Sequence, residues 1–328
     1  MPSEGSAGLS KTQKRKLQKK RAVQRQRQAA SAVASKPSTS RSHSLDVVHE
    51  DEHLIAINKP AGLLCHPSPG FWEHGTVVHV LGSRERTPGY SEISAHMLEQ
   101  RQSYTGEADS FIPRAIVHRL DRGTTGLMLI AKTDLAETRL AEHFKRRTTA
   151  KTYIALLCGR PHDTAALSCQ RIEVLDERGA HLRVEAPIGR DAARPGKVIV
   201  APSGKPATSI VHVHAHERDK SGRRPDLSLV SVELLTGRQH QIRVHCAQCL
   251  GAPLANDDAY GGARLDGLPK SRPMLHAWAM KVPHPSAQGA GAESQLDVHA
   301  PLPEDMQRLI SMHFPSLDVN DPSSWPTI

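Results

Sequence analysis

The sequence predicts an α+β domain built on a mixed, largely antiparallel sheet with flanking helices. Short apolar runs typical of strands are more frequent than segments with helical periodicity, and the two kinds do not alternate as they do in parallel α/β folds. The chain has 328 residues, of which 38% are hydrophobic and 3% aromatic. One large domain or two smaller ones, with an aliphatic core, would fit this length and composition.

The strands are predicted from apolar runs that are bounded by polar or turn-forming residues. They are expected at 47–48, 53–58, 116–120, 127–131, 153–157, 198–200, 209–214 and 228–235. The segments between them are rich in Gly, Pro and charged residues and show little periodicity. We therefore expect a surface excursion and loops at 82–113, 217–226, 261–272 and 286–294.

Helices are predicted where apolar residues recur every three or four positions. The segments concerned are 133–146, 239–250 and 306–313. The first carries Leu135, Leu140 and Phe144 on one face and ends in a basic run. The second is followed by Gly251, which is a typical helix terminator.

The positive charge of the chain is concentrated at its N-terminus. Residues 1–44 contain eleven Lys and Arg and one acid, giving +10, whereas the other 284 residues carry 32 bases and 33 acids, giving −1. Such a basic, polar tail is expected to be disordered and to bind phosphates in a salt-dependent way, or to act as a targeting signal. Contact with RNA and targeting are compatible.

The same composition bears on the compartment. No apolar run is long enough to span a membrane, and the N-terminus lacks the apolar core of a secretory signal. The five cysteines are odd in number and irregularly spaced, which favours a reducing environment. We therefore expect an intracellular protein that does not contact membranes, with nucleus, mitochondrion and cytoplasm all open.

The most informative motif runs from His118 to Gly126, with the sequence HRLDRGTTG. Asp121 lies between Arg119 and Arg122, on a Gly-Thr-Thr-Gly turn that leads into the apolar run 127–131. Neighbouring cations favour the charged form of a carboxylate, so this turn can present a reactive acid. An Asp beside a glycine turn can also serve only to form the turn, and the motif alone leaves both readings open.

Further motifs occur in a fixed order around this one. They are 58–67 (NKPAGLLCHP), 151–159 (KTYIALLCG), 236–245 (TGRQHQIRVH), 257–261 (DDAYG), 275–277 (LHA) and 301–306 (PLPEDM). Together with the Asp121 motif, they resemble the RluA family of RNA pseudouridine synthases over roughly 45–315. Asn256 and Ser209 stand where the family usually has Gly and Thr.

The resemblance implies a pseudouridine-synthase-like fold with a central active-site cleft. It divides the chain into a basic tail (1–44), a catalytic domain (45–315) and a C-terminal tail (316–328). The implied reaction converts specific uridines of structured ribosomal or transfer RNA to pseudouridine by cleaving the glycosidic bond and rejoining the base through C5. RNA is the expected partner and a monomer the default state. No cofactor is implied, and the sequence contains no phosphate-binding loop for a nucleotide.

The resemblance also assigns roles to individual residues. Asp121 would initiate the reaction, Arg243 would pair with it, and Tyr153 would stack on the uracil and take part in proton transfer. The implied substrate contacts comprise Arg119, which would replace the flipped base in the stack, together with His118, Lys59, His66, Lys205 and Arg238. A packed structural role is the simpler reading of His118.

Three alternatives compete with this interpretation. A catalytically silent RNA-binding or ribosome-assembly factor would use the same scaffold. A glycosidase would need a second acid paired with Asp121, and Glu107 or Asp109 has no motif support. Cys246 and Cys249 form a CxxC, but no second CxxC exists and the segment reads as helical, so we expect no metal site.

Overall fold

The computed structural model describes residues 45–66, 76–82, 113–162, 170–287 and 295–327. The basic tail and nearly all of the expected excursion at 82–113 lie outside the described residues. In chain order, the strands are β1 (Asp46–Glu50), β2 (Leu54–Lys59), β3 (Thr125–Ala131), β4 (Ala150–Cys158), β5 (Arg171–Val174), β6 (His181–Glu185), β7 (Ile188–Arg190), β8 (Val198–Val200), β9 (Thr208–Glu217), β10 (Leu227–Leu234), β11 (Leu275–Pro283) and β12 (Gln295–His299). The helices are α2 (Val77–Gly82), α4 (Asp134–Arg146), α5 (Gln241–Val244) and α6 (Glu304–His313), with a π-helical turn at His245–Cys249 and a 3-10 turn at Pro322–Ser324.

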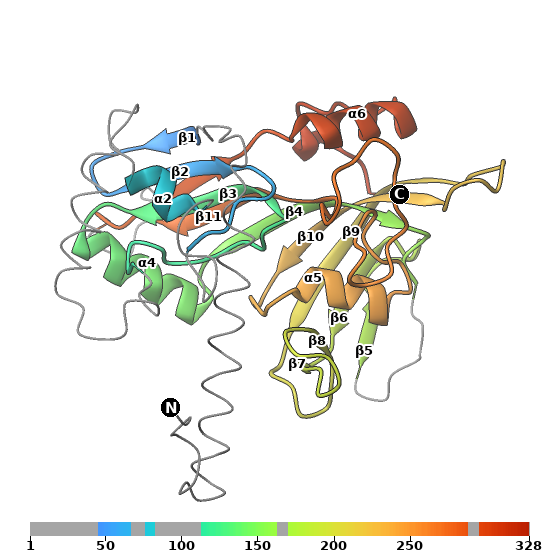
Figure 1. Ribbon diagram of the computed structural model, residues 1–328, viewed down its shortest axis with the longest axis horizontal. Coiled ribbons are helices and arrows are strands. Elements are labelled where there is room, and N and C mark those ends of the chain that lie inside the picture. Colours follow the sequence, from blue (N-terminus) through green and yellow to red (C-terminus); the bar gives the residue numbers. More distant parts are fainter. Residues whose placement is uncertain (1–44, 67–75, 83–112, 163–169, 288–294, 328) are drawn as a thin grey trace, which may run out of the picture.

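A single ten-stranded sheet dominates the described part of the chain (Figure 1). Its order is β1-β2-β3-β11-β4-β10-β9-β6-β5, with β12 paired to β11, while β7 and β8 form a separate ribbon. The pairing of β11 with β3 is parallel, and the other pairings within the sheet are antiparallel. The predicted α+β class with a mixed, largely antiparallel sheet is confirmed.

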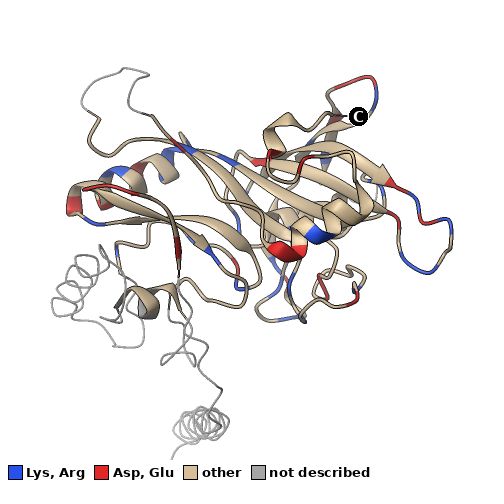
Figure 2. Cartoon of the chain, turned by 90° about the horizontal axis from the view of Figure 1, so that it is seen from above, with Lys and Arg blue, Asp and Glu red and all other residues tan. Residues whose placement is uncertain are grey.

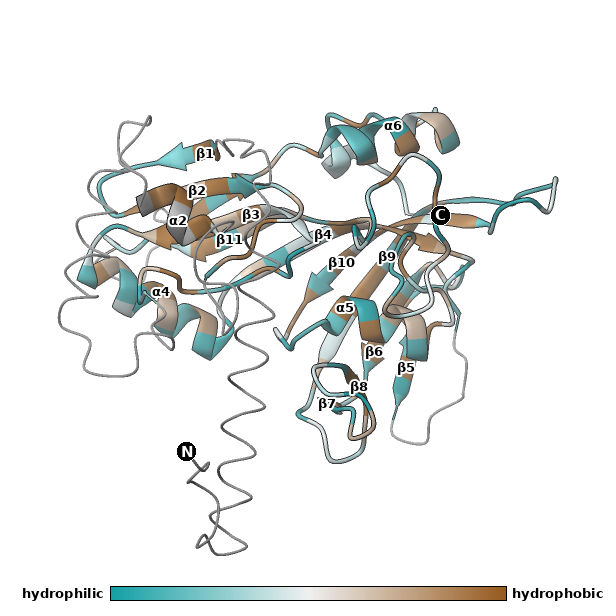
Figure 3. Cartoon of the chain, viewed as in Figure 1, coloured by the Kyte–Doolittle hydropathy of each residue, from teal (hydrophilic) through white to brown (hydrophobic). Residues whose placement is uncertain are grey.

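The first half of the sheet forms around β2 and β3. Every residue of β3 is buried, as expected for a strand covered on both faces. Helix α4 packs nearby because Leu140 and Phe144 lie in or against the same core cluster. The helix begins where the Thr133 hydroxyl accepts a hydrogen bond from the Ala136 amide at 3.2 Å. Figure 3 shows the apolar residues concentrated in these inner strands.

The second half packs β6, β9 and β10 against α5 and the π-helical turn. The predicted helix at 239–250 is present in this form, and Gly251 ends it with φ +62°. Charged residues lie mainly on helices, loops and strand ends (Figure 2). No helix in the described ranges is long and apolar enough to cross a membrane.

The C-terminal segment belongs to the folded domain, which corrects its assignment as a tail. Trp325 is buried in the core cluster that also contains residues of α6. Its indole donates to the carbonyl of Asp318 at 2.6 Å, and the carbonyl of Pro326 pairs with His214 Nδ1 at 2.8 Å. Residues 316–327 therefore cover one face of the sheet together with α6.

One other expectation was wrong. The segment 116–120 is irregular, because side chains rather than a neighbouring strand satisfy its polar groups: the Leu120 amide and carbonyl both bond to the Cys65 sulfur at 3.2 Å. The strands β5, β6, β7 and β12 and the helix α2 were not predicted, and neither was β11. Its sequence, LHAWAMKVP, has no alternation and few β-branched residues, and the strands on either side determine its conformation.

Candidate active site

The Asp121 turn is pressed against the chain that enters β11. A Cβ atom on Gly123 would lie 2.4 Å from the carbonyl oxygen of Ser271. Gly126 has φ +109°, and a Cβ there would lie 2.2 Å from the Ala277 carbonyl oxygen. Only glycine fits at both positions. The two glycines thus allow the turn and β11 to meet with almost no space between them.

Asp121 lies beside two basic side chains from the α5 region. Its Oδ2 is 3.3 Å from Nη1 of Arg243 and 3.6 Å from Nε2 of His240. The Asp121 side chain is 22% exposed, whereas that of Arg243 is 11% exposed. The sequence motifs at 118–126 and 236–245 therefore meet in space. The carboxylate keeps an open side from which a substrate can approach.

Arg243 is held more tightly by a second acid. Its Nε and Nη2 donate to the two oxygens of the buried Asp257, both at 2.7 Å, and its guanidinium lies 4.9 Å from the ring centroid of Tyr260. Burial by itself would lower the pKa of Arg243. The hydrogen bonds and negative charges of Asp257 and Asp121 outweigh burial, so the pKa of Arg243 is raised. The guanidinium is a permanent cation in a fixed orientation.

His240 and Tyr260 complete the surroundings of Arg243. His240 has φ +52°, and its Nδ1 pairs with the Tyr260 hydroxyl at 2.8 Å, which itself donates to the Val198 carbonyl at 3.0 Å. Burial lowers the pKa of His240, although Asp121 acts in the opposite direction. His240, Asp257 and Tyr260 were not among the predicted site residues. Their presence in the motifs at 236–245 and 257–261 was the available signal.

Tyr153 lies on β4 opposite Ala277 of β11, at the junction between the two large core clusters. Burial raises its pKa, and the negative charge of Asp121 adds to this effect. The hydroxyl therefore stays protonated in the range where proteins function. Ala277 pairs with Gly126 as well, so Tyr153 lies close to the Asp121 turn.

Two of the six predicted substrate contacts are bonded within the fold, Lys59 in the interior and His118 at a half-buried position. Lys59 is fully buried, and its ammonium donates to the carbonyls of Pro60 and Leu63 at 2.9 Å and Arg122 at 3.4 Å. Burial lowers the pKa of Lys59 to about 8. This lysine fastens the Asp121 turn to β2, so its expected role as a phosphate contact is wrong.

His118 has a similar structural position. Its Nε2 accepts a hydrogen bond from the Leu129 amide at 2.8 Å, and its ring stacks on Phe144 at a centroid distance of 4.6 Å. Burial, with a smaller contribution from Lys151, lowers its pKa to about 3. The imidazole is therefore neutral and packed, which matches the simpler structural reading of this residue.

The other four expected contacts lie nearer the surface. Arg119 is exposed, and its Nη1 is 3.4 Å from Nε2 of His66. Lys205 is exposed as well, and Arg238 donates through Nε to the Pro206 carbonyl at 3.0 Å. Arg119 and His66 thus lie together next to the Asp121 motif, and Arg238 contacts Pro206, the residue after Lys205, next to α5.

The cysteines of the CxxC are buried, and neither forms a disulfide bond. Burial raises the pKa of Cys246, with additional effects of Cys249 and Asp257. A protonated, enclosed thiol is a poor metal ligand. His245 bonds to Ser209 and to the Ala186 carbonyl, at 3.0 and 3.1 Å.

Comparison with known proteins identifies the family of the chain. A sequence model of the RNA pseudouridylate synthase family matches residues 53–248. The chain is 36% identical over 276 residues to ribosomal large subunit pseudouridine synthase D of Nitrosomonas europaea, covering 81% of this chain and 64% of the relative. It is 36% identical to the protein of the same name from Escherichia coli K12, covering 82% and 70%. It is 30% identical to RNA pseudouridine synthase 2, chloroplastic, of Oryza sativa, covering 81% and 64%.

Solved structures show the same fold. The human RNA pseudouridylate synthase domain containing 4 superposes with a TM-score of 0.52 at 22% identity, covering 87% of this chain and 95% of that one. The fold is that of a pseudouridine synthase domain. The chain belongs to the RNA pseudouridylate synthase family and, within it, to the RluA group. It spans about 64% of the length of the Nitrosomonas and rice relatives.

Proposed function

We propose that this protein converts uridine to pseudouridine in RNA, with residues 45–327 forming the catalytic domain. The observation that carries the proposal is the position of Asp121, a partly exposed carboxylate 3.3 Å from an arginine that Asp257 already binds. Membership of the family supplies the reaction class. No feature of the described residues favours the alternative of a silent RNA-binding factor.

In the proposed reaction the target uridine leaves the RNA stack and enters the site. The exposed guanidinium of Arg119 fills the vacated position, since a planar cation can stack on neighbouring bases and bind phosphate. His66, which lies 3.4 Å from Arg119, contacts the RNA backbone beside it. Lys205 and Arg238 bind phosphates on the α5 side.

Asp121 then initiates cleavage of the bond between N1 of uracil and C1′ of the ribose. The freed base turns, and C5 forms the new bond to C1′, after which the C5 proton is lost and N1 carries a proton. Arg243 holds the Asp121 carboxylate in one orientation, and Tyr153 stacks on the base and takes part in proton transfer at C5. No external reductant, oxidant or nucleotide enters this balance.

The proposed substrate is a structured RNA, and ribosomal RNA is the first to test because two relatives are named for the ribosomal large subunit. The basic segment 1–44 contributes sequence-independent contacts to phosphates. Deleting it leaves the catalytic residues in place and reduces the salt dependence of RNA binding.

The proposal is tested by the release of tritium from RNA labelled at C5 of uracil. Wild-type protein releases tritium from ribosomal or transfer RNA, while Asp121→Asn binds the same RNA and releases none. Asp258→Asn, an exposed acid beside Asp257, is the matched control and retains activity. If the wild-type protein binds RNA and releases no tritium from either pool, the silent-binder interpretation replaces this one.

A further inference from the structure

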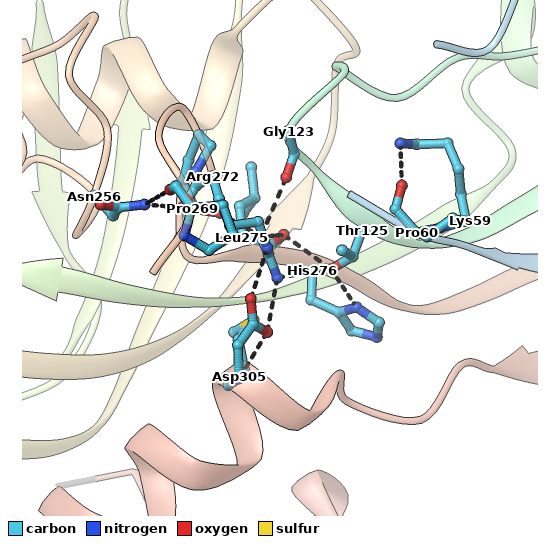
Figure 4. A network of polar contacts seen from close by, with 12 residues as sticks. Lys59, Pro60, Gly123, Thr125, Asn256, Pro269, Arg272, Leu275, His276 and Asp305 are labelled. Atoms are coloured by element: carbon cyan, nitrogen blue, oxygen red, sulfur yellow. Dashed lines mark hydrogen bonds and ion pairs between the residues drawn. The ribbon is translucent and has the colours of Figure 1, made fainter. Parts of the chain in front are cut away.

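A fully buried arginine lies directly beside the Asp121 turn and has no part in the proposed chemistry. Arg272 has a side chain that is 2% exposed. Its guanidinium donates to the carbonyls of Gly123 at 3.2 Å and Leu275 at 3.1 Å, to the carbonyl of Pro273, and to the hydroxyl of Thr125 at 3.1 Å (Figure 4). One side chain therefore joins the catalytic turn to the start of β11.

The charge of Arg272 is balanced from another element. Asp305, in the first turn of α6, accepts from Nε at 3.0 Å and from Nη2 at 3.3 Å (Figure 4). Two charged groups buried in this way stabilise a fold only when their geometry is good, and losing one partner is costly. The ion pair alone is thus compatible with a purely structural role.

The acceptors on the turn indicate a more specific role. Gly123 and Thr125 lie two and four residues after Asp121, and the Thr124 amide between them donates to the Asp121 carbonyl at 3.1 Å. The Thr124 amide closes the turn, and the Arg272 guanidinium therefore binds the residue before it, Gly123, and the residue after it, Thr125. A point charge at this position could satisfy Asp305 but could not reproduce the directed bonds to both acceptors.

The backbone of Arg272 reaches the other half of the site. Its carbonyl accepts from Nδ2 of Asn256 at 2.9 Å. Asn256 has φ +61° and directly precedes Asp257, the acid that fixes Arg243. Arg272 thus contacts the Asp121 turn through its side chain. Through its backbone it contacts Asn256, the neighbour of the Asp257 that binds Arg243.

A second chain of hydrogen bonds strengthens the attachment. The Thr125 hydroxyl accepts from Arg272 and donates to Nδ1 of His276 at 2.9 Å, and Nε2 of His276 donates to the Ala300 carbonyl at 3.1 Å. The tautomer follows from the carbonyl, which can only accept. Thr125 is therefore held in place from two directions, so a displacement of the turn breaks several bonds.

We propose that Arg272 is a positioning residue that sets the distance and orientation between Asp121 and Arg243. This inference rests on the proposed function for its catalytic consequence, although the geometry that it describes can be measured without turnover. A displacement of about 1 Å between reacting groups reduces rates by roughly 100-fold. Loss of the bonds to the turn should therefore appear in the chemical step.

The test uses three variants of the full-length protein. Arg272→Lys keeps the charge for Asp305 and loses the directed bonds. Asp305→Asn keeps the guanidinium on the turn and removes the opposite charge, so it controls for stability. Arg139→Lys controls for the exchange itself, because Arg139 also anchors a loop by donating to the carbonyls of Pro285 and Ala287.

For each variant, the single-turnover rate, the RNA dissociation constant and the thermal unfolding midpoint are measured. We expect Arg272→Lys to lower the rate by about 10- to 100-fold with the dissociation constant within about twofold of wild type. Asp305→Asn should lower the unfolding midpoint at least as much as Arg272→Lys does. Its rate should stay within about threefold of wild type, since the contacts of Arg272 with the turn remain. Arg139→Lys should keep the wild-type rate.

Equal losses of rate in Arg272→Lys and Asp305→Asn, in proportion to lost stability, would overturn the proposal, as would a wild-type rate in Arg272→Lys. Hydrogen exchange of the Thr124 amide provides a readout without catalysis and should be faster in Arg272→Lys only. Unchanged exchange there overturns the proposal even if no variant is active. Inactive wild-type protein with faster exchange in Arg272→Lys instead counts against the proposed function alone.

Discussion

Arg243 is bound more closely by Asp257 than by Asp121: both oxygens of Asp257 accept at 2.7 Å, whereas the nearest oxygen of Asp121 is 3.3 Å away. The buried acid therefore determines where the guanidinium lies. Asp121 interacts with a cation whose charge is already shared, so its carboxylate remains free to react.

This relationship predicts that Asp257→Asn impairs chemistry rather than RNA binding. An amide cannot accept two charged hydrogen bonds, so Arg243 should turn toward Asp121 and pair with it more tightly. We expect the single-turnover rate to fall by at least about tenfold, in line with losses for misplaced catalytic groups. Rates and RNA affinities of Asp257→Asn and the exposed control Asp258→Asn check this, and equal rates in the two variants would contradict it.

The second prediction concerns the hydroxyl of Tyr153. Because its pKa is raised, the hydroxyl carries its proton at neutral and moderately alkaline pH and can donate it. Tyr153→Phe retains the ring that packs between the two cores, so the unfolding midpoint should change little. Turnover should fall by about 100-fold or more if proton transfer depends on this group. Tritium release and calorimetry on the same preparation separate the two effects, and full activity in the variant would limit Tyr153 to stacking.

The third prediction tests the close approach of the Asp121 turn to β11. Gly126→Ala adds a methyl group that would lie 2.2 Å from the Ala277 carbonyl oxygen, in a backbone conformation with φ +109°. We expect the free energy of unfolding to fall by more than about 2 kcal/mol. Gly179→Ala is the control, since φ is also positive there (+68°) but no atom lies within 4 Å. It should cost about 1 kcal/mol, and similar losses at both sites would argue against crowding.

The fourth prediction concerns acid. Burial lowers the pKa of His245 and of His276 to about 4, so both are neutral in the folded protein. Between their ordinary pKa of about 6.5 and pH 4, the unfolded chain binds more protons than the folded one. Stability should therefore be fully present above pH 6.5 and decline as the pH falls toward 4, by about 1.4 kcal/mol per pKa unit for each histidine.

Denaturant unfolding at several pH values measures this slope. His276→Gln should lower stability at neutral pH, because hydrogen bonds to Thr125 and Ala300 are lost, and should flatten the decline in acid. The exposed His299→Gln is the control and should leave the slope unchanged. An undiminished slope in His276→Gln would show that other groups cause the acid sensitivity.

Much of this architecture was accessible from local sequence. The apolar run at 127–131 and the periodicity of 133–146 correspond to β3 and α4, because in both cases the local pattern and the tertiary contacts agree. The site was partly accessible as well: the motifs containing Asp121 and Arg243 were identified, and the two side chains lie 3.3 Å apart.

The remaining features depend on contacts between distant segments. β11 is a strand because it pairs with β3 on one side and with β4 on the other, and its own sequence does not predict this pairing. The sequence around Lys59 and Arg272 is typical of exposed basic residues. In the structure both side chains are buried and donate hydrogen bonds to backbone carbonyls. Asp257 supports Arg243 from a loop, and the distance along the chain conceals the pairing.

The place of β11 has a consequence for biosynthesis. β3 and β4 follow each other in the chain but lie apart in the sheet, with β11 between them. Until residues 275–283 leave the ribosome, the facing edges of two apolar strands lack their partner. Such edges favour pairing with other chains. A nascent chain that stalls after β10 should therefore depend on chaperones, and the site should assemble only near the end of translation.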